Sequence, residues 1–277
     1  MDKPLSPGLH IVATPIGNLG DLGSRAAETL RKADRILVED TRVTSKLLAH
    51  IGAKANMVRY DDHSSQAERD RIVSRLGDEA VALVSDAGTP LISDPGYKLV
   101  RAARAAGHAV HSVPGPSAVI AALTLAGLPT DRFLFLGFLS AKAKARRDAI
   151  AEIAGVRATL VAYESGPRLG ETLAALSGGL GPREAAVVRE ISKLHEECVT
   201  GGLADLAERY AELSPKGEIV IVVGPPSDDA EPDDEMLEAA IDEALSRLSP
   251  SRAAAEVAEK LNVPRKRAYA RALERSK

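Results

Sequence analysis

The chain has 277 residues, 45% of them hydrophobic and 27% charged, a composition typical of a globular protein with one large domain or two of ordinary size. Aromatic residues make up 3% and Trp is absent, so a single-strand-binding surface built from several stacked rings is not expected. Because the formal net charge is −3, any nucleic-acid surface must be a local patch. A single cysteine, Cys198, excludes an internal disulfide and a Cys-rich zinc site.

The N-terminal residues lack the features of a targeting segment. Residues 1–9 have neither the basic region nor the apolar region of a signal peptide. No apolar run approaches the ~20 residues that span a bilayer. We therefore expect a cytoplasmic protein with no membrane association.

Short apolar runs alternate with amphipathic helical stretches from residue 9 to residue 224. Nine runs are expected strands: Leu9–Thr14, Arg35–Glu39, Asn56–Tyr60, Val81–Ser85, Ala109–Val113, Phe133–Phe138, Thr159–Tyr163, Ala185–Arg189 and Glu218–Val223. The helical stretches include Ser24–Ala33 with Ser24 as N-cap, Gln66–Leu76, Tyr97–Ala106 and Leu203–Leu213. Runs that are apolar on both faces and separated by helices are typical of mainly parallel sheets covered on both sides. The sequence therefore predicts an α/β fold.

Nine strands are too many for one tidy doubly wound sheet, and two sheets of about five fit better. The strand–helix pattern breaks at Pro114-Gly115-Pro116, and a helix is expected from Ser117. We therefore predict two small α/β domains, over residues 1–115 and 116–225, followed by a helical extension over residues 226–277.

The extension differs in charge from the rest of the chain. Nine acidic residues lie between Asp228 and Glu243, which predicts a linker that runs into an acidic helix. From Arg247 to Lys277 the charge reverses, with nine Lys and Arg against three Glu. Ser251–Leu261 and Arg265–Glu274, separated by a break, resemble a helix-turn-helix. This extension is either a solvated helical appendage or a nucleic-acid contact, and the basic cluster at the second helix favours the contact.

In open α/β sheets, ligands bind beyond the carboxyl ends of the strands. Three loops at such ends are rich in glycine, proline and small residues: Thr14–Asp21, Ser85–Gly96 and Pro114–Ala118. None contains the dinucleotide-binding GxGxxG motif or the Gly-Lys-Ser/Thr of a phosphate-binding loop. Together they predict a crevice near the domain junction for a medium-sized, partly apolar ligand.

Several dispersed segments carry a family resemblance. Val12–Asp21, Glu39–Arg42, Val84–Gly96 and Val113–Ala118 resemble the tetrapyrrole methylase family, the non-Rossmann class III of S-adenosylmethionine-dependent methyltransferases. Further segments are similar to the branch of this family that 2′-O-methylates a cytidine of 16S rRNA in the decoding region: Phe135–Leu139, Tyr163–Ser165, Arg189–Lys193 and Gly217–Glu218. The resemblance spans residues 8–224 and, more loosely, the basic tail.

The resemblance implies S-adenosyl-L-methionine as cofactor, held in the cleft between the two domains, and a homodimer. The implied cofactor contacts are Pro15, Ser85, Asp86, Ala87, Gly88, Thr89, Ile92, Ser117, Ala118, Tyr163, Gly217 and Glu218. It also implies 16S rRNA or the small ribosomal subunit as partner. A tetrapyrrole C-methyltransferase, which would share the cofactor loops, is the nearest alternative. A non-enzymatic nucleic-acid-binding regulator would leave the three loops without a role.

A ribose hydroxyl is a poor nucleophile, so its methylation needs a general base or a cation that stabilises the developing alkoxide. Charged residues at strand ends are the candidates, although such residues often only form ion pairs. We expect Glu39 or Glu190 to orient the hydroxyl and Lys193 or Arg42 to stabilise the alkoxide. His63 could act as a base at neutral pH, but a loop histidine without a visible partner is more often incidental.

Two basic clusters are candidate RNA contacts. Lys142, Lys144, Arg146 and Arg147 crowd one helix start, and Arg265, Lys266, Arg267 and Arg271 belong to the basic tail. Each cluster is either a solvated helix face or a phosphate contact, and phosphate contacts would make binding strongly salt-dependent. No metal-ligand spacing is visible in the sequence.

Overall fold

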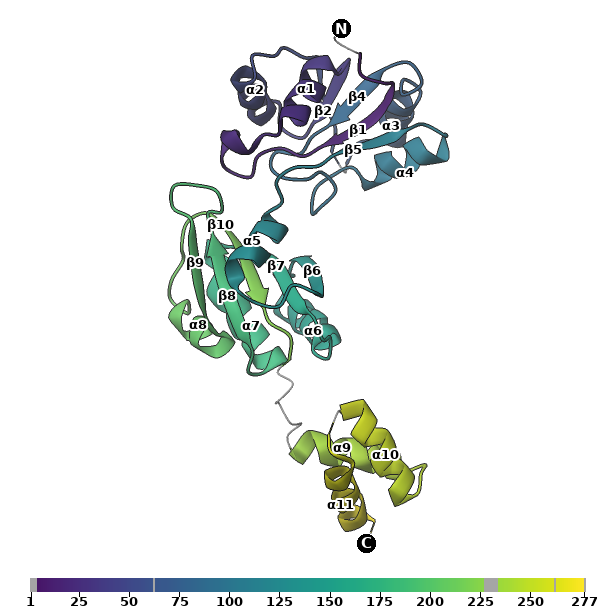
Figure 1. Cartoon of the computed structure of the whole chain (residues 1–277), viewed down its shortest axis with the longest axis vertical. Coiled ribbons are helices and arrows are strands. Elements are labelled where there is room, and N and C mark those ends of the chain that lie inside the picture. Colours follow the sequence, from purple (N-terminus) through teal and green to yellow (C-terminus); the bar gives the residue numbers. More distant parts are fainter. Residues whose placement is uncertain (1–3, 62, 227–233, 262, 277) are drawn as a thin grey trace. The chain divides into compact units, whose positions relative to one another are not determined.

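The computed structural model describes residues 4–61, 63–226, 234–261 and 263–276 (Figure 1). The chain divides into two compact units, Met1–Pro225 and Pro226–Lys277. Most of the predicted acidic linker, residues 227–233, lies outside the described residues.

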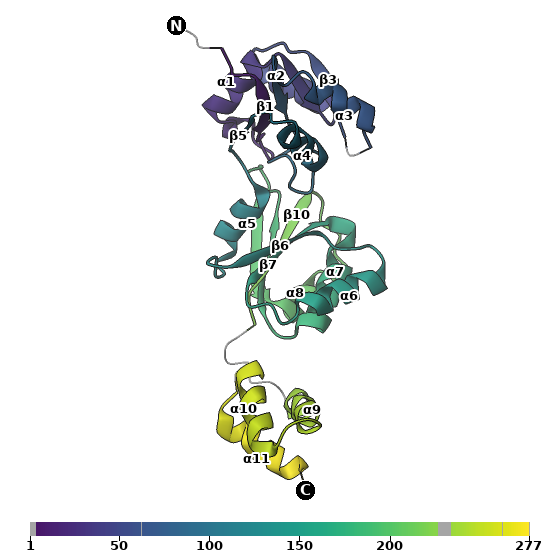
Figure 2. The same cartoon turned by 90° about the vertical axis from the view of Figure 1, so that its right-hand side faces the viewer.

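The first sheet has five parallel strands in the order β3-β2-β4-β1-β5. They are β1 (Gly8–Val12), β2 (Arg35–Val38), β3 (Met57–Arg59), β4 (Ala80–Leu83) and β5 (Val110–Val113). The connecting helices are η1 (Leu19–Asp21), α1 (Ser24–Lys32), α2 (Thr41–His50), α3 (Gln66–Val73) and α4 (Tyr97–Ala105). One apolar cluster packs α1 and α2 against the sheet and a second packs α3 and α4 (Figure 2). Since both faces are covered, the inner strands are mainly apolar, with His10 in β1 as a buried polar exception.

The second sheet also has five strands, in the order β6-β7-β10-β8-β9. They are β6 (Phe133–Phe138), β7 (Thr159–Ser165), β8 (Glu184–Arg189), β9 (Glu197–Gly202) and β10 (Glu218–Val223). Helix α5 (Ala118–Ala126) covers one face. The other face is covered by α6 (Ala143–Ile153), α7 (Leu169–Leu180) and α8 (Leu203–Arg209), with the short η2 (Gly166–Arg168) before α7.

The two-domain α/β fold is confirmed, and all nine predicted strands are present. The expectation of mainly parallel sheets is correct for the first sheet and wrong for the second, where only β6 and β7 are parallel. The cause is β10, which inserts between β7 and β8 and runs against both. Apolar runs predict burial but do not fix strand direction. The 115/116 boundary falls between the two sheets and stays a prediction.

Two local predictions were incomplete. Strand β9, which contains Gly201 and Gly202 and forms a hairpin with β8, was not predicted from the sequence. Ser24 is the first residue of α1 rather than its cap, because Gly23 occupies the N-cap position without a side-chain hydrogen bond.

The C-terminal unit consists of α9 (Asp234–Leu245), α10 (Pro250–Leu261) and α11 (Arg265–Arg275). Its core is small and includes Leu237, Ile241 and Val257, each at most 1% exposed. Helices α10 and α11 correspond to the predicted helix-turn-helix pair. In the part of the chain that the structure describes, no helix has the length and apolar character needed to cross a bilayer.

Candidate active site

A pocket of about 360 Å³ opens at the carboxyl ends of the first sheet's strands. The N-terminal domain contributes the lining residues Ile16, Ala87, Gly88, Thr89, Ile92, Ser93 and Asp94, and Ser117 and Ala118 come from the start of α5 in the second domain. The second sheet and its loops contribute Phe138, Tyr163, Glu164, Ser165, Ile191, Gly217, Glu218, Ile219 and Val220. The predicted crevice is therefore present, with residues from both α/β domains in its wall.

Backbone contacts hold the three small-residue loops together at this pocket. Thr14 and Gly88 exchange two backbone hydrogen bonds, of 2.8 and 3.1 Å between N and O. The Thr14 hydroxyl donates to the carbonyl of Ser85 at 3.2 Å, and the Thr89 hydroxyl donates to the carbonyl of Pro116 at 3.2 Å. Gly88 has a φ of +78°, a conformation that favours glycine. The result is a rigid wall of backbone against which a ligand can pack closely.

Nine of the twelve predicted cofactor contacts line the pocket, and three lie beside it. Pro15 precedes the lining residue Ile16. Ser85 is buried and donates to the carbonyl of Ala87 at 3.2 Å, while Asp86 accepts from the backbone N–H of Asp40 at 3.1 Å. Cofactor binding by the twelve residues stays a prediction.

Glu190 and Lys193 lie together in the turn after β8. The Lys193 Nζ donates to Glu190 Oε1 at 2.8 Å and to Glu218 Oε2 at 2.9 Å. Glu190 Oε1 also accepts from the backbone N–H of Glu218 at 3.1 Å. The hydrogen bond from Lys193 lowers the pKa of Glu190. Burial alone would lower the pKa of Lys193, but its two carboxylate partners outweigh burial and raise that pKa.

This arrangement clamps the turn after β8 onto the start of β10. Gly217 has a φ of +101°, and a Cβ there would collide with the Glu190 carboxyl group. A carboxylate with a lowered pKa and a bound ammonium is a weak base. The geometry thus favours a structural role for Glu190 and Lys193 over the catalytic role expected from the sequence, which stays a prediction.

Glu39 and Arg42 lie after β2. Asp40 caps α2 by accepting from the Arg42 backbone N–H at 2.8 Å, and the Arg42 guanidinium binds the same carboxylate. The hydrogen bond from the Arg42 guanidinium lowers the pKa of the Asp40 carboxyl group to about 2. Arg42 is 87% exposed, so it is accessible to an anionic partner although it is already paired. His63 is exposed, and its backbone N–H donates to Asp61 Oδ1 at 2.9 Å.

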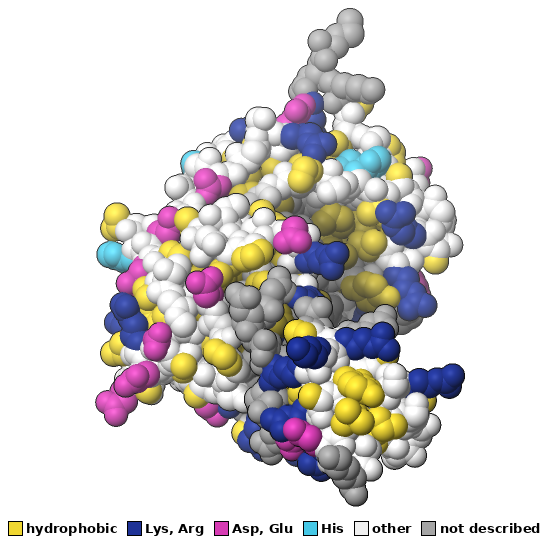
Figure 3. Space-filling model, turned by 60° about the horizontal axis from the view of Figure 1, so that its bottom comes forward, with side chains coloured by type: hydrophobic (Ala, Val, Ile, Leu, Met, Phe, Trp, Pro, Cys, Tyr) yellow, Lys and Arg dark blue, Asp and Glu magenta, His cyan; other side chains and the backbone are white. Residues whose placement is uncertain are grey.

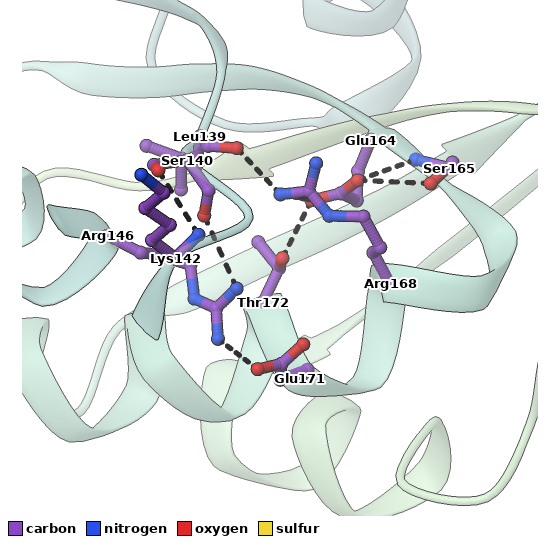
Figure 4. A network of polar contacts seen from close by, with 9 residues as sticks. All are labelled: Leu139, Ser140, Lys142, Arg146, Glu164, Ser165, Arg168, Glu171 and Thr172. Atoms are coloured by element: carbon purple, nitrogen blue, oxygen red, sulfur yellow. Dashed lines mark hydrogen bonds and ion pairs between the residues drawn. The ribbon is translucent and has the colours of Figure 1, made fainter. Parts of the chain in front are cut away.

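A second polar network borders the pocket at Glu164 (Figure 4). This carboxylate is buried and accepts from the Ser165 N–H at 2.8 Å and the Thr172 hydroxyl at 2.7 Å. Arg168 lies 3.3 Å from it and donates to the carbonyl of Leu139 at 2.6 Å. Arg168 thereby links the end of β7 to the loop after β6.

Nine lining residues were not among the predicted cofactor contacts, and they include Asp94, Ser93 and Phe138. Asp94 is half-buried, and burial raises the pKa of its carboxyl group. Ser93 precedes it with a φ of +63°, and Phe138 is 59% exposed beside Tyr163, with ring centroids 5.5 Å apart. Asp94 lies inside a predicted loop. Its position between Ser93 and a Pro-Gly turn is the sequence feature that could have identified it as a site residue.

The first basic cluster contains three exposed side chains and one buried side chain. Lys142, Lys144 and Arg147 are exposed. Arg146 is only 3% exposed, donates to Glu171 Oε1 at 2.5 Å and reaches the carbonyl of Ser140 at 3.4 Å (Figure 4). Because its guanidinium is turned into the protein, the geometry disfavours the expected phosphate contact by Arg146, which stays a prediction.

In the C-terminal unit, Arg265 and Lys266 are exposed at the start of α11, and Arg267 is half-buried. Arg271 pairs with Glu274 at 3.0 Å and with Glu238 at 3.7 Å. Figure 3 shows basic side chains grouped beside hydrophobic ones in the lower part of the view, where the helical unit comes forward. Arg265 and Lys266 are thus the better placed of the four for an external anion.

Residues 8–207 match the family described as Tetrapyrrole (Corrin/Porphyrin) Methylases, and residues 230–276 match the RsmI C-terminal HTH domain. A protein of Erythrobacter litoralis named ribosomal RNA small subunit methyltransferase I is 56% identical over 98% of this chain and 96% of its own length. The chain belongs to the tetrapyrrole methylase family.

Within the family, similarity is high to proteins of the same name. A Mesorhizobium japonicum ribosomal RNA small subunit methyltransferase I is 45% identical over 98% of this chain and 93% of its own length. A solved diphthine synthase shares the tetrapyrrole methylase-like fold, with a TM-score of 0.62 at 17% identity over 78% of this chain and 89% of that one. No group of three or more His, Cys, Asp or Glu side chains suited to a metal ion occurs among the described residues.

Proposed function

We propose that the chain transfers a methyl group from S-adenosyl-L-methionine to the ribose 2′-hydroxyl of a cytidine in 16S rRNA. The observation that carries this proposal is the 56% identity, over 98% of the chain, to a ribosomal RNA small subunit methyltransferase I. The match of the C-terminal residues 230–276 to the HTH domain of the same proteins supports the RNA substrate independently of the pocket.

The pocket suits the proposed cofactor. Its volume of about 360 Å³ lies within the range of small-ligand sites. Apolar side chains such as Ile16, Ile92 and Ile219 suit the adenine ring, and backbone groups of the 87–89 segment can bind its polar edge. Glu218 and Ser165 offer partners for the amino acid portion of the cofactor. The bound cofactor supplies an electrophilic methyl group on a sulfonium.

The chain's own residues position the acceptor. Methyl transfer is an in-line displacement, so the hydroxyl must be held on the side of the methyl carbon away from sulfur. Phe138 at the pocket mouth can stack on a nucleobase, a contact worth about 1–3 kcal/mol in single-strand binding. Lys142, Lys144 and Arg147 are exposed on the loop and helix that follow β6 and would bind flanking phosphates.

The C-terminal unit would provide a second, separate RNA contact through Arg265 and Lys266. A tetrapyrrole substrate gives that unit no role, which disfavours the C-methyltransferase alternative. We also propose a homodimer, following the family resemblance, and a cytoplasmic location, because the substrate is ribosomal.

The test is to incubate the protein with S-adenosylmethionine labelled in the methyl group and small ribosomal subunits from a strain that lacks the activity. A porphyrinogen, naked 16S rRNA and large subunits serve as alternative acceptors. We expect label only in 16S rRNA of the subunit or of the naked RNA. Label on a porphyrinogen alone, or on no acceptor, would refute the proposal. Light scattering of the free protein tests the dimer.

A further inference from the structure

The proposed reaction must dispose of the proton of the ribose hydroxyl, and the pocket wall contains three carboxylates. Asp94 comes from the loop after β4, Glu164 from β7 and Glu218 from β10. A general base must reach the reacting hydroxyl and must not be tied up by stronger partners. The contacts of the three side chains separate them on this criterion.

Glu164 is committed to the protein. Its side chain is 1% exposed, its oxygens accept hydrogen bonds from Ser165 and Thr172, and it forms an ion pair with the Arg168 guanidinium (Figure 4). A substrate hydroxyl could approach it only after one of these donors had left. Leaving a buried carboxylate without one of its donors is strongly unfavourable.

Glu218 is accessible, with 75% of its side chain exposed, but it binds the Lys193 ammonium at 2.9 Å. The same ammonium also binds Glu190, so the three charges form one cluster. To donate its proton to this Glu218 oxygen, a substrate hydroxyl would have to displace the Lys193 ammonium. Glu218 is therefore better suited to bind a cation than to remove a proton.

Asp94 has a different environment. Among the described residues Asp94 forms no ion pair, and the groups that affect the pKa of its carboxyl are the hydrogen-bonded neutral hydroxyl of Ser85 and the like charge of Asp86. Burial, followed by Asp86, raises the pKa of its carboxyl group despite the bond from Ser85. The charge of Asp94 in turn contributes, after burial, to the raised pKa of Tyr163 on the second sheet. Asp94 and Tyr163 thus interact from the two sides of the pocket.

The backbone around Asp94 is held in an unusual conformation. Leu91 and Ser93 have φ values of +75° and +63°, which side chains other than glycine rarely adopt. Gly96 has a φ of +132°, and a Cβ there would lie 2.7 Å from Leu83 Cδ2 in the core. Such strain persists where the surrounding structure fixes a loop, and it is concentrated at functional sites.

We propose that Asp94 is the general base that removes the proton from the attacking ribose hydroxyl. This inference rests on the proposed function. The hydroxyl oxygen forms a bond to the methyl carbon while its proton moves to an Asp94 carboxylate oxygen. The carbon–sulfur bond breaks, and its electron pair stays on sulfur, which becomes a neutral thioether. Asp94 then loses the proton to water.

The test compares Asp94→Asn with the wild-type protein and with Asp78→Asn, a matched control on the exposed turn before β4, at the opposite end of that strand from the pocket loop. General-base catalysis contributes about 10²- to 10⁴-fold. We expect the kcat for small-subunit methylation to fall at least about 100-fold in Asp94→Asn, with KM changed less than about threefold. The Asp78→Asn protein should match the wild type.

Calorimetric measurement of S-adenosylhomocysteine binding shows whether Asp94 acts as the base or as a cofactor ligand. The proposal predicts a Kd within about threefold of the wild type for Asp94→Asn. Loss of binding would overturn it, as would a kcat within about fivefold of the wild type. If the wild-type protein labels no ribosomal RNA, the proposed function fails. If the wild type and Asp94→Asn are both active, only the present inference fails.

Two pH-dependent measurements complete the test. The kcat of the wild type should rise as the pH increases through the pKa of Asp94, and the kcat of Asp94→Asn should not show this rise. Because the folded pKa is raised, ionised Asp94 destabilises the folded protein above that pKa and has no such effect below the unfolded value. Asp94→Asn should therefore raise the melting temperature at pH 7.5, and the gain should vanish in acid. A melting temperature lowered at pH 7.5 would contradict the environment assigned to Asp94.

Discussion

Replacing Arg168 with alanine should destabilise the α/β unit by an amount that the structure allows us to bound. Arg168 contributes the positive charge beside Glu164, whose side chain is 1% exposed. Removing one partner of a fully buried pair costs about 3–5 kcal/mol. Since the Arg168 side chain is 30% exposed, water can enter and reduce the cost to about 2–3 kcal/mol. For a unit of this size that is a fall in melting temperature of about 4–12 °C.

Differential scanning calorimetry of the full chain measures this effect. The two compact units can melt separately, so the α/β transition is identified as the one that S-adenosylhomocysteine shifts upward. Arg147→Ala, which removes an exposed arginine of α6, is the matched control and should change the stability by less than about 0.5 kcal/mol.

The double variant with Glu164→Gln isolates the pair. With Glu164 neutralised, the loss of Arg168 no longer leaves a buried charge without its counterion. The double variant should thus be less destabilised than the sum of the singles, by about 1 kcal/mol or more. A cost below about 1 kcal/mol for Arg168→Ala, or simple additivity in the cycle, would refute the reasoning.

Three further results are expected. Replacing Lys142 and Arg147 together with alanine should weaken binding to the small subunit and reduce the slope of log affinity against log salt concentration by about 2. The variant Arg146→Ala should lower stability and leave that slope unchanged. Filter binding over a series of salt concentrations measures both slopes. The variant Gly217→Ala should weaken S-adenosylhomocysteine binding at least about tenfold, because residue 217 has a φ of +101° and the new Cβ would collide with Glu190. An unchanged Kd in calorimetry would show that the cofactor binds elsewhere. Removing all residues after Pro226 should abolish ribosomal RNA methylation and leave S-adenosylhomocysteine binding nearly intact, and full activity in the methylation assay would show that the C-terminal unit is not an RNA anchor.

The fold was largely predictable because burial leaves a strong pattern in the strands. Runs such as Val81–Ser85 and Glu218–Val223 are apolar on both faces, and each is a strand in the structure. Strand direction was not predictable, since an inserted strand such as β10 has the same pattern whether it runs parallel or antiparallel. β9 was missed because its two glycines and Thr200 interrupt the apolar pattern.

The site was predictable to the level of loops but not of individual side chains. Glycine and proline spacing identified the three loops that meet at the pocket. Charge alone did not distinguish Arg146 from Arg147, because which one faces inward depends on how α6 packs on α7 and places Glu171. The surroundings of Asp94 depend on how the 85–96 loop folds back on itself and on its interaction with Tyr163 of the second sheet, which sequence spacing does not encode.

The chemical position of the transferred methyl group tests the proposed function most directly. After reaction of small ribosomal subunits with methyl-labelled S-adenosylmethionine, the 16S rRNA is hydrolysed in alkali, where cleavage after each nucleotide requires a free 2′-hydroxyl. We predict that the label appears in a single alkali-resistant dinucleotide that releases 2′-O-methylcytidine on enzymatic digestion. Label recovered in a mononucleotide with a methylated base, or in no RNA fragment, would contradict the account.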